Sequence, residues 1–210
     1  MGPIMPFAEQ ACPRLSVVVP CYNEESVLDM LEQRLSAACN DVFGSDFEII
    51  LVNDGSRDRT WPKICALAAR NACIVGVDLS RNHGHQLAVT AGLQISRGDL
   101  VMIIDADLQD PPELLAKMVA KIEQGFDVVY GQRIERHGES AFKRGTAAVF
   151  YKLLNRLAEH DIPLDTGDFR LMTRRVVDQL NAMPERFRFI RGMVSWIGFA
   201  QTALEYERDP

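Results

Sequence analysis

The sequence predicts an α/β fold with a mostly parallel sheet flanked by helices, and further amphipathic helices toward its C-terminus. Short apolar runs rich in Val and Ile recur between residues 15 and 130, as is typical of strands buried on both faces. Amphipathic segments separate these runs, so strands and helices alternate along the chain. Functional residues are therefore expected beyond the carboxyl ends of the strands, where such sheets bind their ligands.

Five apolar runs are predicted as strands, namely residues 15–19, 47–52, 73–77, 100–104 and 127–130. The first is followed by residues 24–38, whose apolar side chains keep helical spacing, and Asn23 is predicted to cap that helix. Thr60 is a candidate cap of the next helix. Asp110, followed by two prolines, is predicted to cap a helix that ends at Gly125.

The chain divides on this basis into three parts. Residues 1–14 form an N-terminal tail without clear periodicity. Residues 15–135 form the ligand-binding core. Residues 136–210 become more basic and helical in pattern, and without a Gly/Ser linker before them they are expected to pack on the core.

Composition excludes several classes of protein. The net charge of −6 argues against a general nucleic-acid surface. Five cysteines with no C-x-x-C pair indicate neither a zinc ribbon nor a disulfide framework, and favour a reducing, cytoplasmic setting. No stretch approaches the roughly 20 apolar residues that span a bilayer. The oligomeric state is left open, and a homo-oligomer is compatible with the sequence.

Two carboxylates one residue apart follow the fourth predicted strand. Alternate residues of an extended chain project to the same side, so Asp105 and Asp107 can converge on one hard cation, Mg²⁺ or Mn²⁺. The amide oxygen of Gln109 is a candidate third ligand. Alternatively, Asp107 and Asp110 are only turn and cap residues.

The first two strands also end in polar loops. Tyr22 can lie beside a base, while Glu24 and Asp54 can accept hydrogen bonds from a ribose or a base N–H. The alternative is that Asn23 and Thr60 are helix caps and Asp54 begins a turn. The two roles are compatible, because a loop rich in caps also directs polar groups.

Together these strand ends resemble glycosyltransferase family 2, the inverting enzymes of GT-A fold that use nucleotide sugars. The resemblance spans nearly the whole chain and rests on residues 19–24, 52–56, 82–84, 91–92, 105–112 and 131–133. Residues 108–113 and 166–172 are similar to the branch that glycosylates polyprenyl phosphates, which includes dolichyl-phosphate mannosyltransferases and bacterial undecaprenyl-phosphate glycosyltransferases. We place the sequence in the bacterial group.

The resemblance implies roles for individual residues. The predicted metal ligands are Asp105, Asp107 and Gln109, for Mg²⁺ or Mn²⁺. The predicted contacts of the nucleotide donor are Pro20, Tyr22, Asn23, Glu24, Asp54, Asp105 and Arg191. The predicted catalytic group is Asp107, Arg133 and Asp168. Arg133 follows the last core strand and its planar fork suits phosphate; the alternative for it is a salt bridge.

Basic and apolar side chains mix in two C-terminal segments. Residues 142–159 carry an apolar helical face edged by basic residues, among them Lys143 and Arg144, which are predicted to hold the acceptor phosphate. This helix either lies on an anionic membrane or packs on the core. Residues 186–199 interleave arginines with aromatic side chains, which favours the membrane surface.

The predicted function is transfer of a sugar, glucose as first choice, from a UDP-sugar to a polyprenyl phosphate such as undecaprenyl phosphate. Asp168 is a candidate base, but a phosphate acceptor has little proton to lose, so it can instead orient the acceptor or pair with Arg170. The expected location is the cytoplasmic face of the inner membrane. His83, His85, His137 and His160 show no metal spacing and are interpreted as local polar residues.

Three alternatives remain open. The related branch carries transmembrane helices after its catalytic domain, whereas the sequence ends at Pro210 without one; it is then either a truncation or an enzyme with a soluble or polysaccharide acceptor. A Mg²⁺-dependent phosphatase of the haloacid dehalogenase type also places D-x-D after an apolar strand, although on its first strand. A non-catalytic protein that binds nucleotide sugars or membranes is the third.

Overall fold

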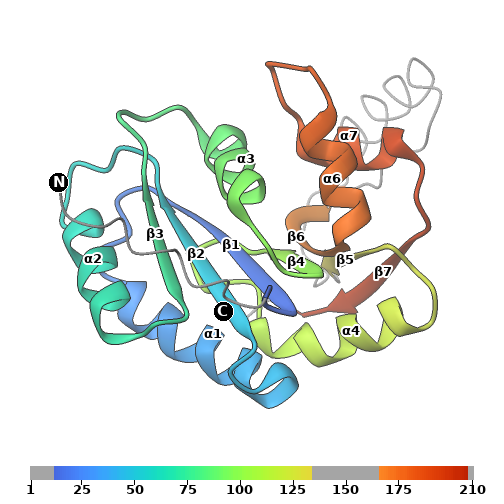
Figure 1. Cartoon of the computed structure of the whole chain (residues 1–210), viewed down its shortest axis with the longest axis horizontal. Helices are drawn as coiled ribbons and strands as arrows, with labels where there is room; N and C mark the ends of the chain where they lie inside the picture. The colour runs from blue at the N-terminus through green and yellow to red at the C-terminus, as the bar shows by residue number, and fades with distance from the viewer. Residues whose placement is uncertain (1–11, 134–165, 208–210) are drawn as a thin grey trace, which may run out of the picture.

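A seven-stranded sheet runs through the protein in the order β3-β2-β1-β4-β6-β5-β7 (Figure 1). The computed structural model describes residues 12–133 and 166–207 of the chain. The strands are β1 Leu15–Cys21, β2 Phe47–Asn53, β3 Ile74–Asp78, β4 Leu100–Ile103, β5 Val128–Arg133, β6 Thr166–Thr173 and β7 Gln201–Tyr206. Neighbours from β3 to β4 pair in parallel, β6 is antiparallel to both β4 and β5, and β7 is parallel to β5.

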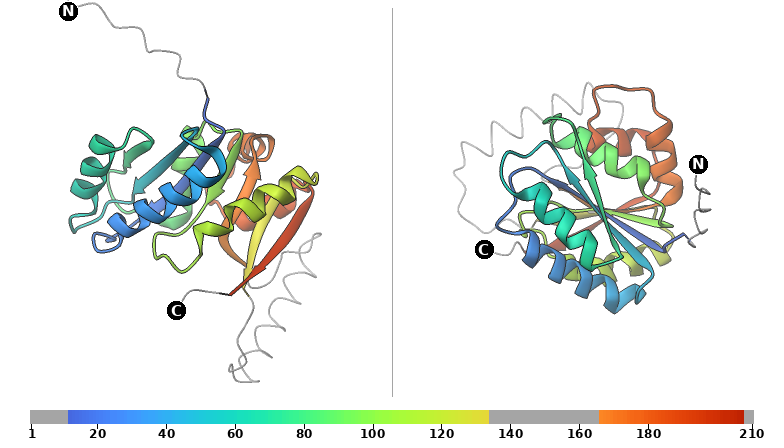
Figure 2. Two further views of the ribbon diagram at one scale, coloured as in Figure 1. Left: turned by 90° about the horizontal axis from the view of Figure 1, so that it is seen from below. Right: turned by 60° about the vertical axis from the view of Figure 1, so that its left-hand side comes forward.

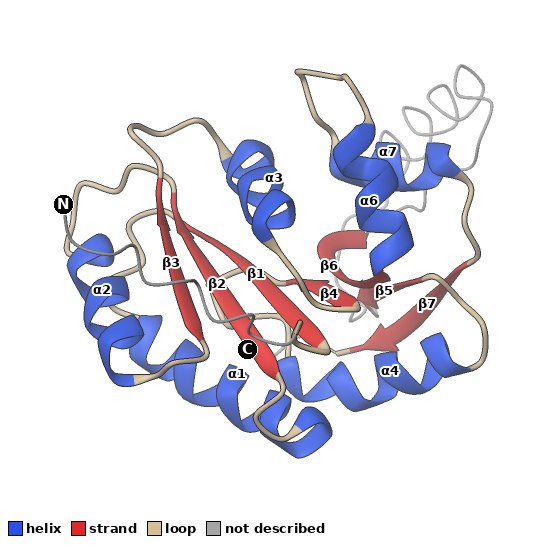
Figure 3. Cartoon of the chain, viewed as in Figure 1, coloured by secondary structure: helices blue, strands red, loops and turns tan. Residues whose placement is uncertain are grey.

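Helices cover both faces of this sheet (Figures 2 and 3). They are α1 Leu28–Phe43, α2 Thr60–Arg70, α3 His85–Ile95, the short 3₁₀ helix η1 Pro112–Leu114, α4 Leu115–Glu123, α6 Arg174–Ala182 and α7 Ile190–Ile197. Helices α1, α2 and α4 pack on one face, whereas α3, α6 and α7 pack on the other. Because both faces are covered, every residue of β1 and β2 is buried. The predicted α/β sheet flanked by helices is confirmed.

A close approach between α3 and the sheet explains one glycine of the sequence. Gly92 lies in α3, directly over β1, and a Cβ atom at this position would be 2.3 Å from a methyl carbon of Val18. Only glycine fits without moving the helix. The contact between Gly92 and Val18 holds α3 against β1, and it thereby positions the first turn of α3, which begins at His85, at the edge of the sheet.

The C-terminal part departs from the prediction of helices alone. Its described residues include α6 and α7, but they also supply two strands of the sheet, of which β6 lies between β4 and β5. No regular apolar run marks β6, because this strand contains the charged pair Asp168 and Arg170. The predicted basic helix of residues 142–159, with Lys143 and Arg144, lies outside the described residues.

Three predicted helix caps are wrong. Thr60 is the first residue of α2 and makes no side-chain cap bond. Helix α1 begins at Leu28, and the Asn23 side chain instead accepts a hydrogen bond from the Arg57 N–H (2.9 Å). Asp110 caps neither η1 nor α4, since it bonds to residues of β5 and β7. In the parts of the chain described, no helix has the length and apolar character needed to cross a bilayer.

Candidate active site

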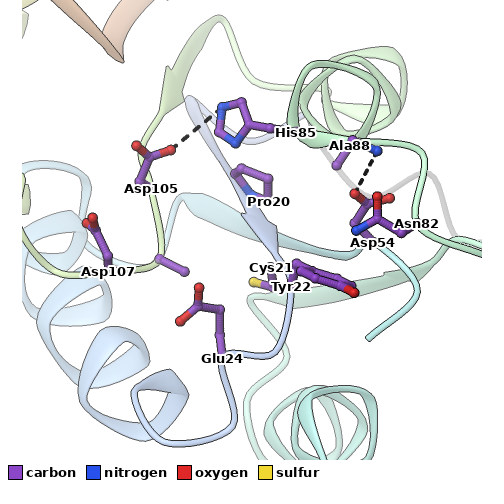
Figure 4. A pocket seen from close by; sticks show the side chains of 12 residues that line it. Pro20, Cys21, Tyr22, Glu24, Asp54, Asn82, His85, Ala88, Asp105 and Asp107 are labelled. Carbon is purple, nitrogen blue, oxygen red and sulfur yellow. Dashed lines mark hydrogen bonds and ion pairs between the residues drawn. The ribbon is translucent and has the colours of Figure 1, made fainter. Parts of the chain in front are cut away.

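An open cavity of about 290 Å³ lies where β1, β2 and β4 end (Figure 4). Six of its lining residues were predicted as ligand contacts: Pro20, Tyr22, Glu24, Asp54, Asp105 and Asp107. Residues that the sequence had not singled out as contacts complete the lining, and they are Cys21, Asn82, Gly84, His85, Ala88 and Ala106. The topology therefore gathers four separate segments of the sequence around one cavity, at the edge of the sheet predicted for ligands.

Carboxylates crowd one side of this cavity. Asp105 is half-buried and Asp107 is exposed, and Glu24 faces both from the β1 loop (Figure 4). Burial raises the pKa of Glu24, and the charges of Asp107, Asp58 and Asp105 raise it further. Burial likewise raises the pKa of Asp105. The site thus holds more negative charge than it neutralises, which favours a bound cation.

The donor atoms of Asp105 and Asp107 fit a hard divalent cation. The Oδ1 atom of Asp105 is buried and has no hydrogen-bond partner among the described residues, so it is available as a ligand. No group of three or more His, Cys, Asp or Glu side chains in those residues is arranged to hold a metal alone. Mg²⁺ commonly binds through one or two carboxylates and completes its shell with water and substrate phosphates. Asp105 and Asp107 suit that arrangement.

The loop that carries Asp107 has an unusual backbone. Leu108, the next residue, has φ = 60°, a left-handed conformation that branched side chains rarely adopt. Asp107 accepts a hydrogen bond from the Gln109 N–H (3.1 Å) across this turn. Such strain costs on the order of 1–3 kcal/mol and concentrates at functional sites. Here it turns the chain sharply after the second carboxylate.

Asp54 shapes the opposite wall of the cavity. Its two carboxylate oxygens accept hydrogen bonds from the backbone N–H groups of His83 (2.7 Å) and Gly84 (2.9 Å). Gly55 follows with φ = +63°, and a Cβ there would collide with the backbone of Arg81. Asp54 therefore braces the loop before α3 in addition to lining the cavity.

We expect Asp54→Ala to lower the free energy of unfolding by about 1–3 kcal/mol, because two loop N–H groups lose their acceptor. Urea denaturation measures this change. Asp178→Ala is the control, since that side chain is 61% exposed and its ion pair with Arg174 spans 3.8 Å. Equal midpoints for the two variants would contradict the bracing role of Asp54.

His85 joins two carboxylates that are distant in sequence. Its Nε2 lies 2.9 Å from Asp168 Oδ2 and 3.7 Å from Asp105 Oδ1. The hydrogen bond to Asp168 raises the pKa of His85 even though burial opposes it. Burial opposes ionisation of Asp168 too, but His85 and Arg170 lower its pKa to about 2. His85 was interpreted as a local polar residue, and its spacing gave no sign of this long-range contact.

Arg133 is engaged by the protein itself. Its Nη2 lies 3.3 Å from Oδ1 of the buried Asp110, and its Nε donates to the Tyr206 hydroxyl (3.2 Å). Burial and the hydrogen bond between Tyr206 and Asp110 raise the pKa of Tyr206 to about 12. These contacts match the salt-bridge alternative, with a buried carboxylate as the partner. The phosphate contact of Arg133 stays a prediction.

Three other predicted contacts stand outside the cavity lining. The Asn23 N–H donates to Ser56 Oγ (3.0 Å), so Asn23 ties the first two loops together. Arg191 stacks its guanidinium over Phe189 at 6.0 Å and keeps a buried Nε without a hydrogen-bond partner among the described residues. The side chain of Gln109 does not line the cavity. The ligand roles of Asn23, Gln109 and Arg191 stay predictions.

Comparison with protein families decides the affiliation. The family model described as glycosyl transferase family 2 matches residues 16–180, which include both carboxylates of the D-x-D and Asp168. The chain belongs to glycosyltransferase family 2. Membership in this family replaces the phosphatase alternative, and the position of the D-x-D after β4, the fourth strand of the chain, agrees with it.

Two curated relatives of this family 2 chain cover most of its length. It is 48% identical over 92% of its length to the uncharacterized glycosyltransferase YkcC of Bacillus subtilis, of which it spans 60%. It is 38% identical over 93% of its length to the bactoprenol glucosyl transferase of Shigella phage SfX, of which it spans 64%. The chain thus spans slightly less than two thirds of these relatives.

Solved structures show the same fold. Glucosyl-3-phosphoglycerate synthase of Mycobacterium tuberculosis, in complex with Mn²⁺, UDP and glucosyl-3-phosphoglycerate, superposes with a TM-score of 0.65 at 22% identity. The match covers 94% of this chain and 71% of the synthase. The chain therefore has the GT-A fold that its sequence predicts.

Proposed function

We propose that this protein is an inverting, metal-dependent glucosyltransferase that moves glucose from UDP-glucose to a polyprenyl phosphate such as undecaprenyl phosphate. The carrying observation is that Asp105 and Asp107 line one cavity together with His85, whose Nε2 also contacts Asp168 of β6. Likeness to a bactoprenol glucosyl transferase supports the acceptor and the sugar. Likeness to a synthase that binds UDP and Mn²⁺ supports the donor and the cation.

The chain's own residues have separable tasks in this proposal. Asp105 and Asp107 hold Mg²⁺ or Mn²⁺, which supplies positive charge to the diphosphate leaving group. Tyr22, Glu24 and the loop braced by Asp54 hold the nucleoside. Arg133 and Arg191 are proposed to meet phosphate oxygens, and Lys143 and Arg144 the acceptor phosphate. Domain roles follow the same division, with residues 15–135 for the donor and 136–210 for the acceptor.

The proposed chemistry is a single displacement. An oxygen of the acceptor phosphate forms a bond to the anomeric carbon while the bond from that carbon to the diphosphate breaks. The electron pair of the broken bond leaves with UDP, and the anomeric configuration inverts. The second proton of a phosphate monoester is lost near pH 6, at about the value of a phosphorylated side chain, so no base is required. Asp168 orients the acceptor.

Incubation of the protein with UDP-glucose, Mn²⁺ and undecaprenyl phosphate tests this function. We expect a glucosylated lipid and free UDP in equal amounts, with GDP-mannose and UDP-N-acetylglucosamine used more slowly. A second arm replaces the lipid with a soluble phosphate or a polysaccharide acceptor. Transfer in that arm alone would mean that the acceptor is soluble rather than a lipid. Donor binding without turnover in either arm would mean that the protein is not an enzyme.

We also propose contact with the cytoplasmic face of the inner membrane through the segment between α6 and α7 and through α7 itself. Phe187 is 99% exposed and Phe189 52% in that segment, and Trp196 in α7 is 66% exposed. Together with Arg186, these side chains form a mixed cationic and aromatic surface. Such mixtures favour the interface of an anionic bilayer.

Replacement of both Phe187 and Trp196 by Ser is expected to weaken binding to phosphatidylglycerol vesicles by at least about tenfold, since burial of one such aromatic contributes roughly 1.5–3 kcal/mol. Vesicle co-sedimentation measures the change. Met30→Ser is the control, because Met30 is 59% exposed on α1, on the opposite face of the sheet. Unchanged binding of the double variant would move the membrane contact elsewhere.

A further inference from the structure

One amide side chain, Gln86 in the first turn of α3, joins three elements near the cavity. Its Nε2 donates to Asp168 Oδ2 in β6 at 2.7 Å. Its Oε1 accepts the backbone N–H of Ile190, the first residue of α7, at 2.9 Å. A carboxylate only accepts and a backbone N–H only donates, so these two partners fix which end of the amide faces which.

The contacts of Asp168 show what this arrangement achieves. Oδ2 accepts hydrogen bonds from Gln86 Nε2 and from His85 Nε2, the latter at 2.9 Å. Oδ1 is buried, 3.6 Å from the Arg170 guanidinium, and has no hydrogen-bond partner among the described residues. The protein therefore holds both oxygens, Oδ2 through two side chains of α3 and Oδ1 through the charge of Arg170.

Gln86 also fixes the carboxylate relative to α7. The first N–H groups of a helix have no partner within the helix, and Gln86 supplies an acceptor to one of them. The pKa of the Arg170 guanidinium is lowered mainly by burial, and the nearby positive charge of Arg191, the next residue of α7, lowers it further. Gln86 therefore fixes the position of Asp168 relative to the start of α7, the helix that carries Arg191.

We propose that Gln86 is a positioning residue for sugar transfer, which holds the Asp168 carboxylate in place against His85 at the edge of the cavity. This role rests on the proposed function. Gln86 acts only through Asp168 and does not line the cavity. Glutamate at this position would set a second carboxylate against Asp168, and leucine would offer neither a donor nor an acceptor.

The test compares Gln86→Leu, Gln86→Glu and a control, Gln94→Leu, which changes an exposed glutamine on the same helix. We expect kcat with UDP-glucose and undecaprenyl phosphate to fall by about 10- to 100-fold in both Gln86 variants, the scale of a misplaced catalytic constellation. Gln86→Glu retains the acceptor for the Ile190 N–H, so it isolates the contact to Asp168. The KM for UDP-glucose and the thermal stabilisation by UDP with Mn²⁺ stay unchanged, as does kcat of Gln94→Leu.

A double-mutant cycle with Asp168→Asn separates positioning from general support of the fold. If Gln86 acts through Asp168, the double variant is no slower than Asp168→Asn alone. The positioning role is overturned if the loss of kcat in the double variant equals the product of the losses in the two single variants, or if Gln86→Glu retains full kcat. Either result leaves the proposed function standing. Wild-type protein that makes no lipid-linked glucose overturns both. Melting temperatures of all variants identify any loss of activity that comes from unfolding.

Discussion

Asp107→Ala is expected to lower kcat for sugar transfer by about 10²–10³-fold, the range for removal of one preorganised electrostatic group. Asp107 is exposed at the cavity rim and lies beside Glu24 and Asp105, whose pKa values are raised. Its loss therefore removes a cation ligand without opening a cavity in the core. Initial rates with saturating UDP-glucose and Mn²⁺ measure the effect, with Asp178→Ala as the exposed-carboxylate control.

Although Asp107→Ala is expected to lower activity, it is not expected to lower the melting temperature of the protein. Without metal, Asp107 repels the neighbouring carboxylates, so Asp107→Ala is expected to melt at the same temperature as the wild type or higher. A loss of activity with retained stability assigns the defect to the site. Transfer at an undiminished rate by Asp107→Ala would remove the basis of the metal role.

The core of the fold was predictable because its signals are local. Strands β1 and β2 are buried over their full lengths, so their sequences are mostly apolar, with Ser16 and Glu48 as buried exceptions, and they can be recognised without knowledge of a partner strand. The polar loops that follow such strands gather at one edge in any parallel sheet, and the structure places the D-x-D, Tyr22 and Asp54 around one cavity as predicted.

The errors arise where distant residues compete with local chemistry. Asn23 and Asp110 have the side chains and positions of helix caps, but each finds a hydrogen-bond partner from another part of the chain. Strand β6 was not predicted for a similar reason, because it carries a charged residue that only the folded structure pairs. Arg170 is 2% exposed in the middle of the sheet, and it is tolerated there because Asp168 and the Gly167 carbonyl oxygen meet its guanidinium.

The contacts of Asp168 were invisible for a related reason. His85 and Gln86 approach it across 83 and 82 positions of sequence, respectively, through the packing of α3 on the sheet. No spacing rule connects residues so far apart. A histidine and a glutamine at the start of a helix are ordinary surface residues until the fold brings a carboxylate to them.

Removal of the divalent cation is expected to abolish both donor binding and transfer. A nucleoside diphosphate would bring its own negative charge to a rim that already holds Glu24, Asp105 and Asp107. Two like charges 4 Å apart repel by about 4 kcal/mol at an effective dielectric constant of 20, so each uncompensated contact costs several hundred-fold in affinity. The donor therefore needs the cation to approach at all.

Thermal unfolding with UDP measures this dependence without relying on turnover. At a UDP concentration about 100 times its dissociation constant, we expect about 2.7 kcal/mol of stabilisation in the presence of Mn²⁺ and none after chelation with EDTA. Excess Mn²⁺ or Mg²⁺ restores the shift in the wild type, whereas Asp107→Ala needs far more of either ion. Equal stabilisation by UDP with and without EDTA would mean that side chains alone hold the diphosphate, with Arg133 and Arg191 then the cations to remove next.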